Sequence, residues 1–88
     1  MTESKDKLGE LRQKIDQIDA DILKLINNRA ECALEVAEVK QQESGDVAPV
    51  YYRPEREAQV LRTIASLNKG PLSNEKVTQV YRQIISAC

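Results

Sequence analysis

The stretch LRQKIDQIDADILKLINNR, from Leu11 to Arg29, decides the fold of this 88-residue chain. Its apolar residues recur at alternating steps of three and four, which places them on one face of a helix with coiled-coil spacing. This apolar stripe continues on both sides of the stretch and consists of Leu8, Leu11, Ile15, Ile18, Ile22, Leu25, Cys32, Val36 and Val39. Because Ser44, Gly45 and Pro49 interrupt the pattern, the sequence predicts one helix from Leu8 to about Glu43.

Two shorter helices are expected after it. Pro54 suits the first turn of the second helix, and Gly70-Pro71 is a typical stop signal. Ser73 is a favourable N-cap for the third helix. The predicted inner faces are Val60, Leu61, Ile64 and Leu67 on the second helix and Val77, Val80, Tyr81, Ile84, Ile85 and Cys88 on the third. Because the last pattern has no stop signal, we expect residues 1–88 to be one domain cut from a longer chain.

The composition agrees with an all-α class. Hydrophobic residues make up 41% and charged residues 31%, and with three Tyr and no Phe or Trp the core must consist of aliphatic side chains. A chain this short holds one domain. The net charge of -1 and the absence of a basic run argue against nucleic acid or anionic membrane as a partner. No apolar run approaches the roughly 18 residues of a membrane span.

The sequence offers little for a metal or cofactor. It has no His, and its two cysteines, Cys32 and Cys88, are too far apart in sequence for a zinc motif. We therefore expect no metal, no cofactor and two reduced thiols. No signal peptide is recognisable, so a cytoplasmic location is expected.

The length of the first helix predicts a homodimer. About 36 residues make a helix of roughly 54 Å, whereas a compact chain of this size is roughly 31 Å across. The rest of the chain is therefore too small to bury the far half of the apolar stripe. The simplest partner that can bury it is a second copy of the chain.

One residue interrupts the stripe. Arg29 stands where the spacing requires an apolar side chain, and a guanidinium there needs an anion. Lys40 lies within about 20° of the same helix face, whereas Arg12 is about 25 Å away along the axis. An antiparallel second copy would bring its Arg12 towards Arg29 and Lys40. The alternative for Arg12 is a solvent-exposed ion pair with Asp16.

The second helix adds two charged residues beside its apolar face, Arg56 and Glu57. Together with the cations of the first helix they could line a cavity with excess positive charge. Such a cavity would select a small dianion, with Glu57 as the acid that faces it.

The chain resembles a known family, the all-helical chorismate mutases, and most closely the N-terminal domain of bifunctional chorismate mutase/prephenate dehydratases. The resemblance runs from about Leu8 to Cys88 and rests on LRQKIDQIDADILKLINNR, on the VAEVK run that ends at Lys40, and on YYRPERE from Tyr51 to Glu57. It implies three helices per chain in an intertwined homodimer with two shared sites. It also implies the cofactor-independent Claisen rearrangement of chorismate to prephenate.

The resemblance implies a role for each candidate residue. Arg29 and the partner chain's Arg12 would hold the two carboxylates of chorismate with help from Arg56. Lys40 would donate to the ether oxygen, and Glu57 would accept from the ring hydroxyl. Two further substrate-binding candidates depart from the family pattern. Arg53 stands where Asp is common, and Cys88 stands where Ser is common and is a weaker hydrogen-bond donor.

Two alternatives remain at this stage. An isochorismate-pyruvate lyase resembles the same fold and uses similar cations on an isomeric substrate. A non-catalytic helical dimerisation module would use its cations only to balance surface acids.

Overall fold

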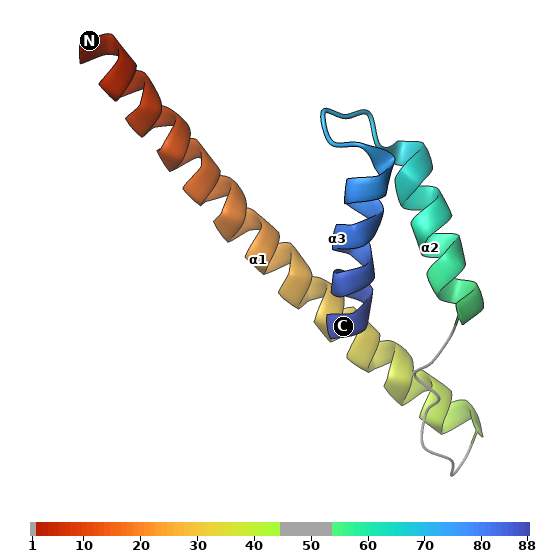
Figure 1. Cartoon of the computed structure of the whole chain (residues 1–88). Coiled ribbons are helices and arrows are strands. Elements are labelled where there is room, and N and C mark those ends of the chain that lie inside the picture. The colour runs from red at the N-terminus through yellow and green to blue at the C-terminus, as the bar shows by residue number, and fades with distance from the viewer. Residues whose placement is uncertain (1, 45–53) are drawn as a thin grey trace.

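The computed structural model describes residues 2–44 and 54–88, and these residues form three helices and no strand. The helices are α1 (Thr2–Ser44), α2 (Pro54–Leu67) and α3 (Asn74–Ala87). Figure 1 shows α1 as a long rod, with α2 and α3 as a hairpin on one side of it. The predicted all-α class, with one long helix and two shorter ones, is confirmed.

Helix α1 begins earlier than the sequence predicts. It contains 43 residues and starts at Thr2, whereas the apolar spacing starts at Leu8. The residues in between are polar, so they extend the helix without adding to its apolar face. The molecule measures 66 × 23 × 16 Å with a radius of gyration of 18.1 Å, and α1 accounts for its longest dimension.

The α2–α3 hairpin is held by a bonded loop and a capped helix. Ser73 caps α3 as predicted, because its Oγ accepts a hydrogen bond from the backbone N–H of Lys76 at 3.2 Å. Helix α2 ends at Leu67, three residues before the predicted Gly70-Pro71 stop. There the Asn68 side chain donates to the Leu72 carbonyl and accepts from the Gly70 N–H, at 2.9 and 3.1 Å. Gly70 itself takes a positive φ of 76°, which favours glycine.

Two of the predicted inner-face residues are exposed in one chain. Leu67 is 66% exposed and Val80 is 52% exposed. Leu67 lies about 120° around α2 from the half-buried Leu61, and Val80 lies about 100° around α3 from the half-buried Tyr81. The other predicted inner-face residues of the hairpin are half-buried: Val60, Leu61, Ile64, Val77, Tyr81, Ile84, Ile85 and Cys88.

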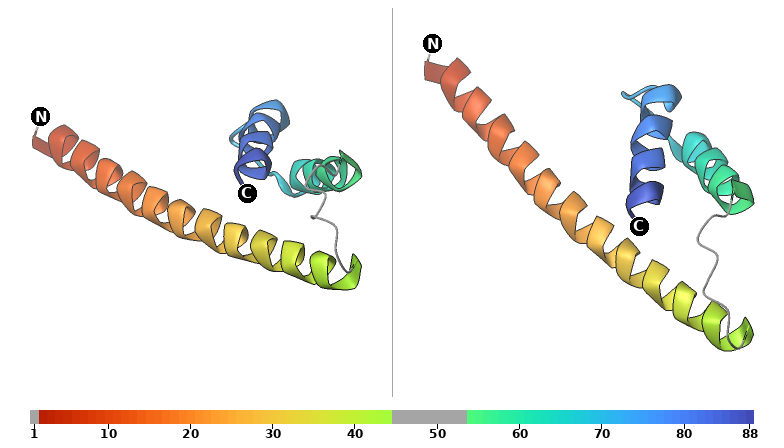
Figure 2. Two further views of the ribbon diagram at one scale, coloured as in Figure 1. Left: turned by 90° about the horizontal axis from the view of Figure 1, so that it is seen from below. Right: turned by 60° about the horizontal axis from the view of Figure 1, so that its bottom comes forward.

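Among the described residues, the hydrogen bonds between the hairpin and α1 come from the C-terminal end of α3 and reach Ile26 and Arg29. The half-buried residues of α1 are Ile26, Arg29, Ala30, Ala33, Ala37 and Lys40. Both views in Figure 2 show the N-terminal half of α1 extending past the hairpin. From Leu8 to Ile22 the apolar stripe is exposed by 44–55% per side chain, and none of the described side chains is fully buried. One chain alone therefore leaves this half of the stripe uncovered.

Candidate functional site

The candidate site lies on the half-buried face of α1, which the C-terminal end of α3 meets at Arg29. Arg29 and Lys40 are both half-buried there, on the same side of the helix as Ile26 and Ala33. Within the part of the chain that the structure describes, neither cation forms an ion pair. Their positive charge is therefore not neutralised by a carboxylate among these residues.

Arg29 has one polar partner among the described residues, and it comes from α3. Its Nη1 donates a hydrogen bond to the Sγ of Cys88 at 3.6 Å. The Cys88 thiol also lies 3.2 Å from the Ile84 carbonyl oxygen and 4.0 Å from that of Ile26. The contact therefore joins the C-terminal end of α3 to the middle of α1 (Figure 1).

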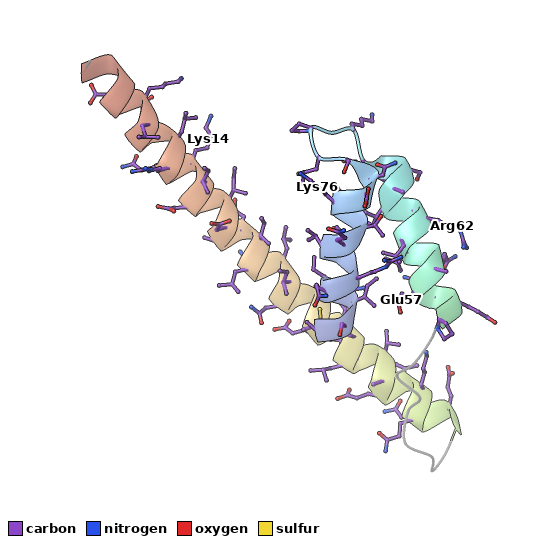
Figure 3. All side chains as sticks on the ribbon, viewed as in Figure 1. Lys14, Glu57, Arg62 and Lys76 are labelled. Atoms are coloured by element: carbon purple, nitrogen blue, oxygen red, sulfur yellow. The ribbon has the colours of Figure 1, made fainter. Side chains whose placement is uncertain are left out.

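Helix α2 contributes one acid to the inside of the hairpin and keeps its arginines outside. Glu57 is half-buried, whereas Arg56 and Arg62 are exposed. Figure 3 shows Glu57 on the side of α2 towards α3, and Arg62 pointing away from it. The Arg56 guanidinium donates to Gln59 Oε1 at 2.7 Å, along the outer surface of the same helix. Glu57 thus lies on the inner side of the hairpin and Arg56 on its outer surface.

Two predicted site residues are not part of this arrangement. Arg12 is exposed on the uncovered half of α1, about 25 Å from Arg29 along the helix axis. No ion pair joins it to Asp16 among the described residues, so the surface-pair alternative has no support here. Arg53 lies outside the described residues.

Sequence reasoning did not foresee the link between Arg29 and Cys88. From the sequence, Cys88 is expected to be a weak hydrogen-bond donor to the substrate, and Arg29 is expected to need an anionic partner. The two residues are 59 positions apart, so only the packing of α3 against α1 brings them together. No local spacing in the sequence could have indicated it.

Among the described residues, no three Cys, Asp or Glu side chains are grouped so as to hold a metal ion. None of the three helices combines the length and the apolar character needed to cross a bilayer. Both Cys32 and Cys88 are free thiols.

Comparison with known proteins gives consistent matches. Residues 11–88 match the family "Chorismate mutase type II". The bifunctional chorismate mutase/prephenate dehydratase of Pseudomonas aeruginosa is 55% identical over 84 residues, which cover 94% of this chain and 23% of that protein. The chorismate mutase of Methanocaldococcus jannaschii is 44% identical over 80 residues, which cover 91% of this chain and 77% of that protein.

Solved structures agree with the sequence matches. A chorismate mutase structure from Thermus thermophilus superposes with a TM-score of 0.80 at 27% identity, and the match covers 92% of this chain and 96% of that one. The chain spans less than a quarter of the length of its bifunctional relatives, and its place in a longer protein stays a prediction. Because the family match extends over nearly the whole chain and the fold agrees with it, this chain belongs to the chorismate mutase type II family.

Proposed function

We propose that this chain catalyses the rearrangement of chorismate to prephenate. One observation carries the proposal: two cations without a carboxylate partner among the described residues, Arg29 and Lys40, are half-buried on one face of α1 in a member of this family. Half-buried positive charge without a protein anion is an unfavourable arrangement unless an anionic ligand completes it. A small dianion such as chorismate meets that need.

This reaction requires the protein to position the substrate and to stabilise developing negative charge, and it requires no nucleophile. In a Claisen rearrangement the ether C–O bond breaks while a C–C bond forms within the same molecule, so no group is gained or lost. The protein must hold the substrate in its compact reactive shape and stabilise the negative charge that develops on the ether oxygen. The absence of His from the sequence is no obstacle to such a reaction.

We assign the roles within one chain as the resemblance to the chorismate mutases implies them. Arg29 has planar donors that match a carboxylate, so we place it on one carboxylate of the substrate. Lys40, on the same face of α1, is the donor to the ether oxygen, and the half-buried Glu57 accepts from the ring hydroxyl. Arg53 and Arg56 are further substrate-binding candidates, and Cys88 takes part through its contact with Arg29.

A homodimer completes the proposed site. Arg12 is too far along α1 to reach a ligand held by Arg29 of its own chain. In an antiparallel pair of α1 helices, two residues that lie level with each other are equally far from the two-fold axis. The partner's Arg12 therefore lies level with a residue between 29 and 40 when the axis crosses α1 between about residues 20 and 26. The same pairing covers the exposed half of the apolar stripe, from Leu8 to Ile22. We therefore propose two sites per dimer, each built from both chains.

The deciding experiment is a direct assay of the purified chain with chorismate and, separately, with isochorismate. Saturable formation of prephenate is the expected result. Release of pyruvate from isochorismate without prephenate formation would favour the lyase alternative. No turnover of either substrate, together with no binding of a dicarboxylate transition-state mimic, would favour the dimerisation module. A cytoplasmic location stays a prediction from the sequence, and dehydratase activity is not part of the proposal.

A further inference from the structure

The contact between Arg29 and Cys88 points to a role for the thiol that differs from binding the substrate. The Cys88 sulfur is 3.2 Å from the Ile84 carbonyl oxygen, to which its S–H can donate. The sulfur lone pairs then remain for the Arg29 guanidinium, whose Nη1 approaches to 3.6 Å. The sulfur is thus an acceptor towards Arg29, fixed by the last turn of α3.

We propose that Cys88 is a positioning residue that holds the Arg29 guanidinium in its substrate-binding orientation. The inference rests on the proposed function for its kinetic consequence, since it takes Arg29 as the group that binds a carboxylate. The restraint itself does not depend on the reaction, because it only requires that the Cys88 sulfur holds the Arg29 guanidinium.

An arginine side chain has many rotamers and always carries a positive charge. The hydrogen-bond acceptor that holds it therefore decides both how well it is oriented and whether its charge stays available for a ligand. Among the described residues, the sulfur of Cys88 is the only hydrogen-bond acceptor that Arg29 uses. A carboxylate in that place would hold the side chain more firmly but would also neutralise it. A neutral sulfur restrains one of the five N–H donors and leaves the charge and the other four donors for an anionic ligand.

This role predicts a specific kinetic pattern. If Cys88 acts by orienting Arg29, its loss weakens a contact made in both the ground state and the transition state, which changes KM more than kcat. We expect Cys88→Ala to raise KM about three- to tenfold and to leave kcat within about twofold. Cys88→Ser keeps a neutral acceptor at this position and should restore most of the loss. Cys32→Ala makes the same change at an exposed thiol of α1 and should leave KM unchanged.

A double-mutant cycle separates positioning from direct contact with the substrate. In an Arg29→Met protein, assayed at high enzyme concentration, adding Cys88→Ala should lower kcat/KM no further. If the losses in kcat/KM caused by the two substitutions multiply in the double variant, the proposal is wrong. An unchanged KM in Cys88→Ala would also overturn it. Circular dichroism and sedimentation of each variant confirm that helix content and association state are preserved.

A second measurement is independent of turnover. Guanidinium NMR signals of Arg29 report how freely the group rotates. We expect faster rotation in Cys88→Ala than in the parent protein, with Cys88→Ser close to the parent. Equal rotation in all three proteins would contradict the contact even if the parent enzyme is active. Absence of turnover in the parent protein would instead contradict the proposed function, and the NMR comparison would still decide whether Cys88 restrains Arg29.

Discussion

Arg29 and Lys40 lie half-buried on the same face of α1, eleven residues apart in the sequence. A helix rises about 1.5 Å per residue, so their Cα atoms are about 17 Å apart along the axis. Both side chains are long, and their head groups can approach one small molecule from its two ends. This separation suits two different tasks on one ligand, one cation on a carboxylate and the other on the atom where charge develops.

The role of Lys40 at the atom where charge develops gives a direct prediction for catalysis. Lys40→Ala should lower kcat by about 10²- to 10³-fold, because a donor placed at developing negative charge stabilises the transition state more than the bound substrate. The measurement is steady-state conversion of chorismate to prephenate. Circular dichroism and sedimentation should show an unchanged helical assembly.

Lys24→Ala is the matched control for this variant. Lys24 is an exposed lysine on the same helix, so its loss should leave kcat within about twofold of the parent value. An equal loss of turnover in both variants, or none in Lys40→Ala, would contradict the role assigned to Lys40.

The start of α3 gives a prediction about stability. Ser73→Ala removes the side-chain acceptor for the Lys76 N–H and should lower the free energy of unfolding by about 1 kcal/mol. Urea denaturation at fixed protein concentration measures the difference. Ser86→Ala makes the same change at an exposed position in the last turn of α3 and should change the free energy of unfolding by less than about 0.5 kcal/mol. A Ser73→Ala protein as stable as the parent would show that the cap contributes little.

Local signals in the sequence predict the number and order of the helices but not all of their boundaries. Ser73 as N-cap and Pro54 as first residue are confirmed because capping depends on a few neighbouring residues. The start of α1 was placed six residues late because its first turns are polar and have no apolar spacing. Leu67 is exposed in one chain because it lies about 120° around α2 from the half-buried Leu61.

The candidate site was only partly accessible to the same reasoning. The odd position of Arg29 within an apolar stripe is a local signal, and the structure places this residue on the half-buried face of α1. The partner that Arg29 contacts is not local, since Cys88 reaches it only through the packing of α3. Arg12 shows the limit most clearly. Its proposed role depends on a second chain, and one chain leaves it exposed.

The uncovered half of the apolar stripe predicts how the chain associates. Ile15 is 55% exposed in one chain, and a polar substitution at a solvent-exposed position usually changes stability by less than about 0.5 kcal/mol. If a second copy covers this position, Ile15→Asp buries a carboxylate at the interface and should convert the dimer to monomer. Sedimentation velocity over a range of protein concentrations measures this directly. Turnover should fall together with association, because each site loses the partner's Arg12.

Gln13→Asp introduces the same charge two residues away, on the opposite side of α1. It should leave the dimer intact. A monomeric parent protein, or an Ile15→Asp protein that associates as the parent does, would remove the basis for shared sites.

Sharing of sites between chains also predicts a pattern of recovery in mixtures. Arg12→Ala and Lys40→Ala chains should each be nearly inactive alone. In a mixed dimer, one site combines Arg29 and Lys40 of the Arg12→Ala chain with the intact Arg12 of the other chain. The second site carries both defects. After subunit exchange of equal amounts, half of the dimers are mixed and half of their sites are intact, so activity should recover to about a quarter of the parent value.

The matched control is a mixture of Arg29→Ala and Lys40→Ala chains. Both residues belong to the same chain's contribution to a site, so every site in that mixed dimer retains one defect and no recovery is expected. Exchange is verified by mass spectrometry of dimers that carry an isotope label on one variant. Equal recovery in the two mixtures would contradict the assignment of Arg29 and Lys40 to one chain's share of a site. No recovery in the first mixture, with exchange verified, would show that the two chains do not build their sites jointly.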